Sequence, residues 1–398
     1  MPTAPLINFG VVGFITKIMK QILLFYFITL IFTSCTSNPK KKKVSLEPIS
    51  SVNFPVDKRT SFKSRYIKPY RNNSGQEFLI FLSENKPSIK FFDLKNQSLV
   101  KEIFLQKEGP DGVGERITGL LVTSMDSIFV FSPYQYSISL VNGKGKLLRR
   151  YSLIDSKGIN KNTGMAIAYS FSAPTKIGNE IFVNISPDRS IFSSDIMNAK
   201  INLKLNIVTG EFEYFNQWPQ YFQNKIWSYF CMLFASEYAN NQFIYSYRMA
   251  DSLYTLAPGS RKKKAFFAKT KFNLNSVSPF LGARTDSNDK KQSYFFNNTC
   301  YGAILYDEYR NIYYRLVRHA IPYKSKDGQI NEFHRRPISI MVFDEKFQVL
   351  GETLLEKDKY YSNMSFVTKD GLYISNANPY NNEINEDYST FTLFKLED

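Results

Sequence analysis

Residues 109–153 decide the fold of this chain, and they read GPDGVGERITGLLVTSMDSIFVFSPYQYSISLVNGKGKLLRRYSL. Apolar and polar residues alternate within GERITGLLVT, SIFVFS, YSISLV and KLLRRYSL, which predicts four short strands rather than a helix. Asp126-Ser127 joins the first pair of strands, and Asn142-Gly143-Lys144-Gly145 joins the last pair. Glycine and asparagine supply the positive-φ positions that such hairpins need. A lone four-stranded sheet leaves its faces partly uncovered, so we expect this unit to stack against copies of itself.

Copies of the second strand recur along the chain, each with a polar or glycine turn followed by apolar and aromatic residues. They are QEFLIFL from Gln76, DSIFVFS from Asp126, NEIFVNI from Asn179, NQFIYSY from Asn241, RNIYYRL from Arg310 and DGLYISN from Asp370. A spacing of about 50 to 70 residues suits a four-stranded blade with variable loops. The sequence therefore predicts an all-β fold, a six-bladed β-propeller of four-stranded antiparallel blades, with seven blades as the competing count.

The predicted blades occupy residues 65–105, 109–153, 166–218, 226–269 and 294–355, and a sixth follows to the end of the chain. The sixth has only three clear strands, the last being TFTLFKL at Thr390 to Leu396. An N-terminal strand within Lys43 to Phe54 is the natural fourth. Closure of this kind joins the two ends of the domain, predicted at 44–398, and removes exposed sheet edges.

The N-terminus reads as an export signal. Residues 19–35, MKQILLFYFITLIFTSC, combine a short basic segment, an apolar run and small residues before a cysteine. The apolar run is short for a membrane-spanning helix, although an uncleaved anchor is the alternative. Residues 1–35 are therefore predicted to be a signal peptide whose true start is Met19. Residues 36–43 form a basic tether.

The signal resembles the lipobox of bacterial lipoproteins, in which Cys35 would be acylated and become the new N-terminus. Together with KEGPDGVGERI before a DSIFVFS-type strand, it makes the chain resemble six-bladed propeller lipoproteins of Gram-negative bacteria, often described as TolB-like and grouped as domain-of-unknown-function family 4221. The resemblance implies a propeller in the cell envelope, held at the outer membrane by a lipid anchor. It implies no catalytic residues. The segment after Cys35 carries no acidic residue before Glu47, unlike surface-exported lipoproteins, which favours a periplasm-facing protein.

The formal net charge of +16 raises the question of an anionic partner. Outside KKKK at 40–43 and Arg261-Lys262-Lys263-Lys264, the basic residues are scattered among acids, which favours a solvated basic surface. The export signal further disfavours nucleic acid as a partner.

Motifs that carry chemistry are scarce. The glycine cluster at 109–114 is followed by a strand instead of the helix that a phosphate-binding loop requires, so it is interpreted as a linker between blades. Only His319 and His334 are present, which argues against a polyhistidine metal site, and there is no calcium loop or Gly-x-Ser-x-Gly elbow. We therefore predict no catalytic residue, metal or cofactor. Cys231 and Cys300 are expected to be two buried thiols, with a disulfide as the alternative.

The one loop with clustered polar chemistry is IPYKSKDGQINEFHRRP in blade five. Arginine beside aromatic residues suits carboxylate, phosphate or sugar recognition, although a solvated hairpin tip is the simpler interpretation. The candidate binding residues are Tyr323, Lys324, His334, Arg335 and Arg336. We expect a membrane-tethered module that binds a protein, peptide or glycan in the cell envelope. The alternative is a periplasmic hydrolase or lyase with carboxylates and asparagines at the central channel.

Overall fold

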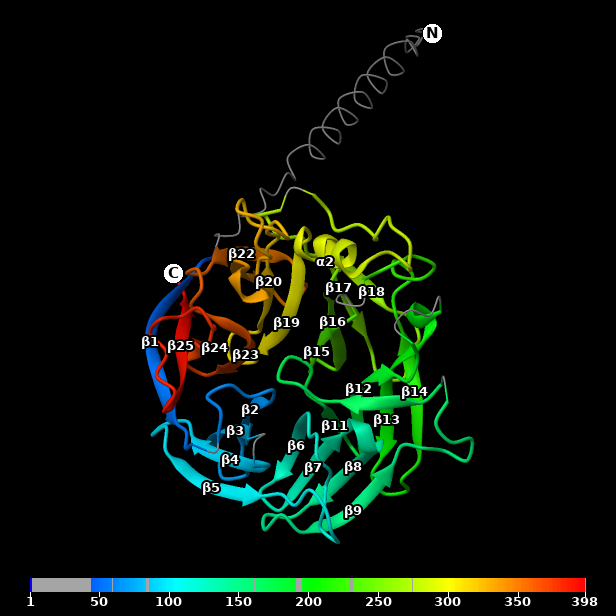
Figure 1. Cartoon of the computed structure of the whole chain (residues 1–398), viewed down its shortest axis with the longest axis vertical. Helices are drawn as coiled ribbons and strands as arrows, with labels where there is room; N and C mark the ends of the chain where they lie inside the picture. The colour runs from blue at the N-terminus through cyan, green and yellow to red at the C-terminus, as the bar shows by residue number, and fades with distance from the viewer. Residues whose placement is uncertain are drawn as a thin grey trace. The chain divides into compact units, whose positions relative to one another are not determined.

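The computed structural model describes residues 1, 44–58, 60–83, 86–160, 162–190, 195–228, 232–273 and 275–397. Within them, six antiparallel sheets stand around a common centre like the blades of a propeller (Figure 1). This confirms the predicted six-bladed architecture. The predicted signal peptide, its Cys35 and the tether lie outside the described residues, as does Cys231.

Each blade runs from an innermost strand at the centre to an outermost strand at the rim. Blades one and two consist of β2 (Ile67–Arg71), β3 (Glu77–Ser83), β4 (Ser88–Asp93), β5 (Leu99–Phe104), then β6 (Gly119–Ser124), β7 (Ser127–Ser132), β8 (Ser137–Val141) and β9 (Leu147–Ser152). Blades three and four consist of β10 (Gly164–Ile167), β12 (Glu180–Pro187), β13 (Lys200–Asn206), β14 (Phe212–Gln217), then β15 (Phe234–Ala239), β16 (Gln242–Tyr247), β17 (Ser252–Leu256) and β18 (Lys264–Phe267). Blades five and six consist of β19 (Cys300–Asp307), β20 (Ile312–Arg318), β21 (Ile338–Phe343), β22 (Val349–Leu354), then β23 (Tyr361–Thr368), β24 (Gly371–Ser375), β25 (Tyr388–Leu396) and β1 (Leu46–Pro55).

Smaller elements are attached to the six blades. The short strand β11 (Thr175–Ile177) pairs with β12 beside β10. Helix α2 (Asn288–Phe296) precedes β19, and its N-terminus is capped by Ser287, whose side chain accepts a hydrogen bond from Lys290 N. Blade five was predicted to start at residue 294. This was wrong, because residues 288–296 form a capped helix and the first strand of the blade begins at Cys300. Among the described residues, single-turn 3-10 helices lie at Pro133–Gln135, Ile196–Asn198 and Phe333–Arg335.

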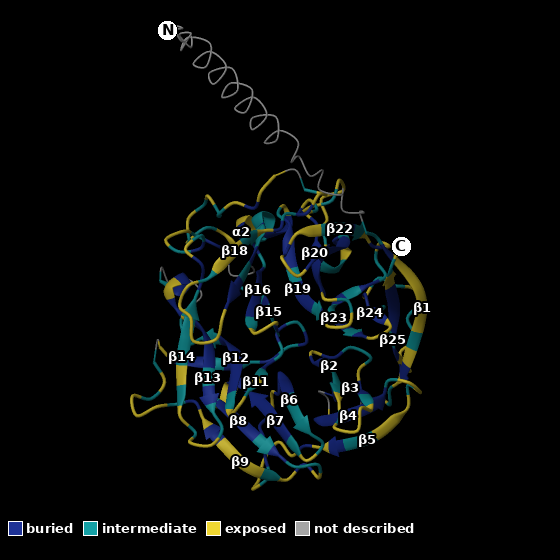
Figure 2. Cartoon of the chain, turned by 180° about the vertical axis from the view of Figure 1, so that it is seen from behind, coloured by how far each residue is buried: buried dark blue, intermediate teal, exposed yellow. Residues whose placement is uncertain are grey.

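The repeated signature found in the sequence is the second strand of every blade. β3, β7 and β16 are each buried at all positions after the first, because a second strand has neighbours on both faces and both edges. The outermost strands carry the exposed residues, and Figure 2 shows the exposed colour running along the rim at β5, β9 and β1.

The turn between β8 and β9 shows how blade two fits against blade one. Asn142 Oδ1 accepts hydrogen bonds from the backbone amides of Lys144 and Lys146, each at 3.0 Å. Gly145 has φ of +76°, and a Cβ there would collide with the carbonyl oxygen of Phe104 on β5. Glycine at this position therefore serves both the turn and the contact between the blades.

The apolar core lies between neighbouring blades. Five buried clusters each join two or three adjacent blades, and together they complete the circle. The cluster between blades six and one contains Phe54 of β1, which is fully buried against Phe92 of β4 and Phe391 of β25. Because no blade can bury its faces alone, the ring is stable only as a whole.

The outer strand of blade six comes from the N-terminal side of the domain. β1 pairs antiparallel with β25 from Leu46 opposite Leu396 to Pro55 opposite Tyr388. The start of β1 also touches blade five, where Val44 N donates to Leu350 O at 3.2 Å. No helix in the described part of the chain is both long and apolar enough to span a membrane.

Candidate functional site

The centre of the ring is filled by the chain itself. The segment from Ala168 to Pro174, which we call the plug, connects β10 to β11 and lies in the middle of the ring (Figure 1). Ser170 Oγ accepts a hydrogen bond from Ile67 N of blade one at 2.8 Å, and Phe171 O accepts one from Ser236 N of blade four at 3.2 Å. Phe171 packs against two core clusters, which span blades three to five and blades five and six, and Ala173 packs against the cluster of blades one and two. Ala168 belongs to the cluster of blades two and three, so the plug contacts every blade-to-blade cluster except the one between blades six and one.

A row of buried asparagines fixes the plug to blades three and four. Asn216 Nδ2 donates to Asn202 Oδ1 at 2.6 Å, and Asn202 Nδ2 donates to Asn184 Oδ1 at 2.6 Å. Asn184 Nδ2 then donates to the hydroxyls of Ser172 in the plug and Ser236 in β15. Each amide is hydrogen-bonded to its neighbour, so the row joins the plug to blades three and four through groups that already have partners.

Charged groups in the channel are also paired. Lys68 Nζ of β2 lies 3.1 Å from Glu237 Oε2 of β15, so an ion pair joins opposite blades. Glu237, Asn184 and Asn202 line a void of only about 10 Å³. A void of that size has room for at most one water molecule.

An open pocket lies above the plug, on the face where the innermost strands begin, which we call the start face. Its larger part, of about 610 Å³, is lined by polar residues that include Arg65, Glu115, Arg116 and Tyr134. The Arg116 guanidinium lies 5.0 Å from the centre of the Tyr134 ring, and both side chains are exposed. This pairing presents a flat aromatic and cationic wall to the solvent.

A smaller, mostly apolar part adjoins it, with a volume of about 230 Å³. The two parts share Ile167, Tyr169, Ser186 and Leu233, so they form one recess, which we call the start-face pocket. The apolar part is lined by Phe171, Ile196, Ile201, Trp218, Met232 and Phe234, with Asn184 and Ser172 among its polar groups. Sequence reasoning missed these residues because they come from the plug, three strands and two connections, and no local motif joins them.

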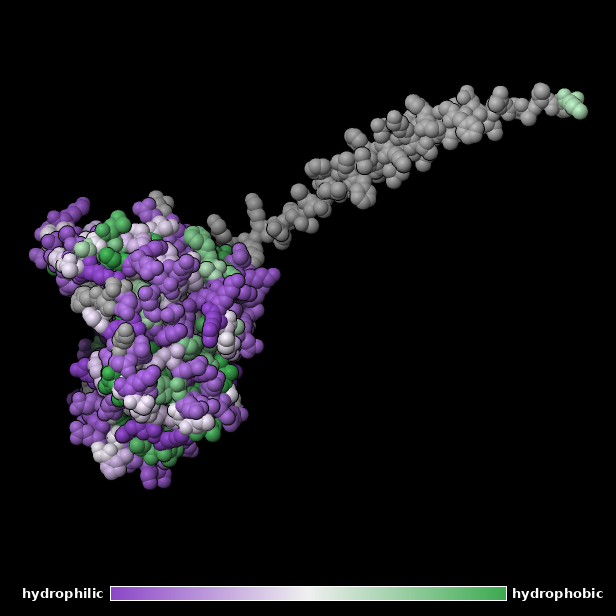
Figure 3. All heavy atoms as spheres, turned by 90° about the vertical axis from the view of Figure 1, so that its right-hand side faces the viewer, coloured by the Kyte–Doolittle hydropathy of each residue, from purple (hydrophilic) through white to green (hydrophobic). Residues whose placement is uncertain are grey.

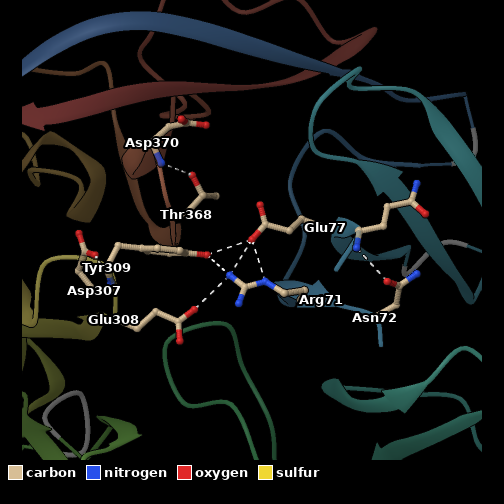
Figure 4. Close-up of polar contacts among 9 residues, drawn as sticks. Arg71, Asn72, Glu77, Asp307, Glu308, Tyr309, Thr368 and Asp370 are labelled. Carbon is tan, nitrogen blue, oxygen red and sulfur yellow. Dashed lines mark hydrogen bonds and ion pairs between the residues drawn. The ribbon is translucent and has the colours of Figure 1, made fainter. Parts of the chain in front are cut away.

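At the mouth of the channel on the opposite face, charged side chains pair with one another (Figure 4). Arg71 Nη2 lies 2.9 Å from Glu77 Oε1 and 3.3 Å from Glu308 Oε1, and it also donates to the hydroxyl of Tyr309. The network joins blade one to the β19–β20 turn of blade five. Burial and the hydrogen bond to Glu77 raise the pKa of Tyr309 to about 12, so its phenol stays protonated at neutral pH and is not poised to act as a base.

The candidate binding residues of blade five do not converge on one surface. Tyr323 is buried, and its hydroxyl donates to Gln292 Oε1 of α2 at 2.8 Å. Lys324 is exposed, and its backbone forms an isolated antiparallel β-bridge with Ile330. The Arg335 guanidinium lies 2.8 Å from the Asp358 carboxylate and stacks on the Tyr380 ring. Their role in binding stays a prediction.

The remaining two candidates are a buried arginine and a half-buried histidine. Arg336 is buried, and it donates to the backbone carbonyls of His319 at 2.8 Å and Phe295 at 3.2 Å, which is a structural role. The half-buried His334 ring lies 5.6 Å from the ring of Tyr361, at the start of β23. The pKa of His334 is lowered by burial and by the nearby Arg318 and Lys63.

Potential metal ligands and thiols are sparse in the described part of the chain. It contains no group of three or more His, Cys, Asp or Glu side chains placed to hold a metal ion. Cys300 is a buried free thiol at the start of β19, and its sulfur accepts a hydrogen bond from Arg336 Nη1 at 3.4 Å.

The relatives of the chain agree with this architecture. Residues 43–354 match the family model described as "Domain of unknown function (DUF4221)". The chain belongs to this family. A crystal structure of a DUF4221 member from Bacteroides vulgatus is similar, with 24% identity, coverage of 90% of this chain and 100% of that one, and a TM-score of 0.77.

More distant structures share the fold alone. A provisionally assigned exported protein from Bacteroides fragilis has 11% identity, covers 89% of this chain and 96% of its own, and has a TM-score of 0.52. A streptogramin B lyase has 13% identity, coverage of 89% and 98%, and a TM-score of 0.41, which is too low to support an argument about chemistry. No functionally curated protein matches the chain. The TolB-like assignment and lipid attachment at Cys35 stay predictions.

Proposed function

We propose that this DUF4221 protein is a lipid-anchored, periplasm-facing binding module of the cell envelope that takes a peptide segment of a partner protein in its start-face pocket. The predicted signal at residues 19–35 supports the envelope location. So does the similarity to the Bacteroides fragilis protein that is provisionally assigned as exported. The observation that carries the binding role is the plug. It fills the channel with the chain's own backbone and leaves an open, two-part recess above it.

The same observation weighs against the alternative, a hydrolase or lyase at the channel. Glu237 and the asparagines do meet there, as such a site would require, but they are bonded to Lys68 and to one another. The void beside them, about 10 Å³, has no room for a substrate. A catalytic carboxylate needs space next to it for the reacting atoms, and Glu237 has none.

The chemistry of the pocket favours a peptide over a glycan. The apolar part has the size and lining to receive one aliphatic or aromatic side chain, and water released from it would contribute to affinity. The polar part offers the Arg116–Tyr134 wall and the exposed Arg65 to the neighbouring backbone and side chains. A hydroxyl-rich sugar would gain little from the apolar part.

The test is selection of random peptides on the purified protein. We expect enrichment of peptides that carry an aromatic or aliphatic anchor. Leu233→Asp places a charge at the junction of the two parts and is expected to weaken such peptides at least tenfold, or about 1.4 kcal/mol. Leu233 is 43% exposed, so the fold should tolerate the change.

Val208→Asp is the matched control, because Val208 is 61% exposed in the β13–β14 turn and does not line the pocket. It should leave peptide affinity unchanged. Selection without enrichment, or peptides that bind Leu233→Asp as tightly as the parent protein, would reject the proposed function.

A further inference from the structure

Blade five carries three buried arginines with very different surroundings. Arg315 of β20 is fully buried and donates to Ser246 Oγ, Ala268 O and Ala250 O at 2.9, 3.0 and 2.9 Å. Arg336 donates to several backbone carbonyls, as described above. Arg318, at the end of β20, is 6% exposed, and its side chain makes one hydrogen bond to the described residues, from Nη2 to Asn363 Oδ1 at 3.0 Å. A guanidinium has five N–H donors, so Arg318 stands out from its two neighbours.

No anion balances Arg318 within the described residues. Its guanidinium stacks 4.6 Å from the centre of the Phe333 ring, and no described Asp or Glu carboxylate lies within ion-pair distance of it. The charged groups that act on it include Arg248 and Arg336, which are also cationic. Burial and the Arg248 charge lower the pKa of Arg318 to about 9.

Other basic side chains gather at the same place. Lys63, which precedes β2, has its Nζ 5.9 Å from the centre of the Tyr361 ring, and His334 lies on the same tyrosine. Arg318 and Arg248 end or follow second strands, while Lys63 and Tyr361 precede or begin innermost strands. In an antiparallel blade these positions share one edge, so the cluster lies on the start face, as the start-face pocket does.

We infer that Arg318 is the base of an oxyanion subsite on the start face, which takes a carboxylate or phosphate group. The subsite deepens the proposed function, on which it rests for the identity of the face, by assigning the ligand a negative charge. A buried cation that lacks an anionic partner is costly, and a planar guanidinium offers paired donors that match two oxygens of such a group. Asn363 and Tyr361 flank it with further polar groups.

The experiment compares melting temperatures of the purified protein in chloride, acetate and inorganic phosphate at constant ionic strength. We expect acetate or phosphate at tenfold over its dissociation constant to raise the melting temperature by about 2 °C. Arg318→Met should lose this rise. In chloride, Arg318→Met should melt no lower than the parent, because the substitution removes an unbalanced buried charge rather than a structural bond network.

Arg261→Met is the matched control, since Arg261 is an exposed arginine in the β17–β18 turn, lines neither part of the start-face pocket and should keep the full response. A response to acetate identifies a carboxylate ligand, and a response to phosphate alone identifies a phosphate ligand. A melting temperature that rises equally in the parent and in Arg318→Met, or does not rise at all, rejects the subsite. So does a large loss of stability in Arg318→Met in chloride, which would mark the residue as structural. Rejection of the subsite leaves peptide binding intact, and failure of the peptide selection leaves the anion response intact, so the two proposals fail separately.

Discussion

His319 is an uncharged base sealed inside blade five. Its Nε2 lies 2.8 Å from Ser339 Oγ, while Nδ1 is buried without a hydrogen bond in the described structure. Burial lowers the pKa of His319, against an opposing effect of Glu352, because the imidazolium would lose its hydration. The folded state therefore takes up the proton at lower pH than the unfolded chain does.

This predicts a pH dependence of stability. The unfolded imidazole has a pKa near 6.5, so below that value the unfolded chain binds more protons than the folded one, and the free energy of unfolding decreases as pH falls. His319→Gln keeps a polar side chain but cannot titrate. Denaturant unfolding at several pH values between 5 and 7.5 should show a shallower decline for His319→Gln than for the parent. Parallel curves would contradict the assignment.

At the same scale, the sequence grouped Tyr323 with Arg335 and Arg336 because they share one loop. It could not show that Tyr323 turns toward α2 or that Arg336 is saturated by backbone carbonyls, since burial depends on elements far away in sequence. The sequence did not point to Arg318, because a sequence does not show whether the N–H donors of an arginine in an apolar strand have hydrogen-bond partners.

The plug is the element that the sequence did not reveal. AIAYSFSAPT, from Ala166 to Thr175, alternates like any strand, and the predicted blade three begins there correctly. Whether such a stretch continues along a blade or turns into the channel depends on the space that the other five blades leave. The second strand of each of the six blades was predictable, because its own residues, a turn followed by an apolar run, indicate a strand without reference to distant parts of the chain.

The asparagine row should make the plug sensitive to Asn184. Asn184→Ala removes the acceptor of the buried Asn202 amide and the amide donor shared by Ser172 and Ser236, at a cost of about 1–3 kcal/mol in the free energy of unfolding. Thermal and denaturant midpoints measure this loss. Asn198→Ala, at an exposed position of the same blade, should change stability by less than about 0.5 kcal/mol. Equal midpoints for the two variants would show that the row does not hold the plug.

At the scale of the whole molecule, stability depends on closing the ring through β1. Phe54→Ala removes a fully buried ring from the contact between blades six and one, and we expect a loss of about 3–5 kcal/mol. Ile49→Ala lies on the same strand but at a position that is 54% exposed, so its effect should stay within about 0.5 kcal/mol. Comparable unfolding midpoints for both variants would mean that β1 adds little to the ring.

One side of the ring has a surface of mixed polarity. On the side seen in Figure 3, apolar residues are scattered among hydrophilic ones.

The pairing of β1 with β25 also means that the ring can close only after its last strand has been synthesised. Asn53 and Thr390 share a side-chain hydrogen bond at 2.8 Å although they are 337 positions apart. During synthesis, β1 leaves the ribosome first and has no partner until the final strand follows it. Until then the chain is an open arc with two bare sheet edges, and a nascent chain that ends before residue 388 cannot close the ring.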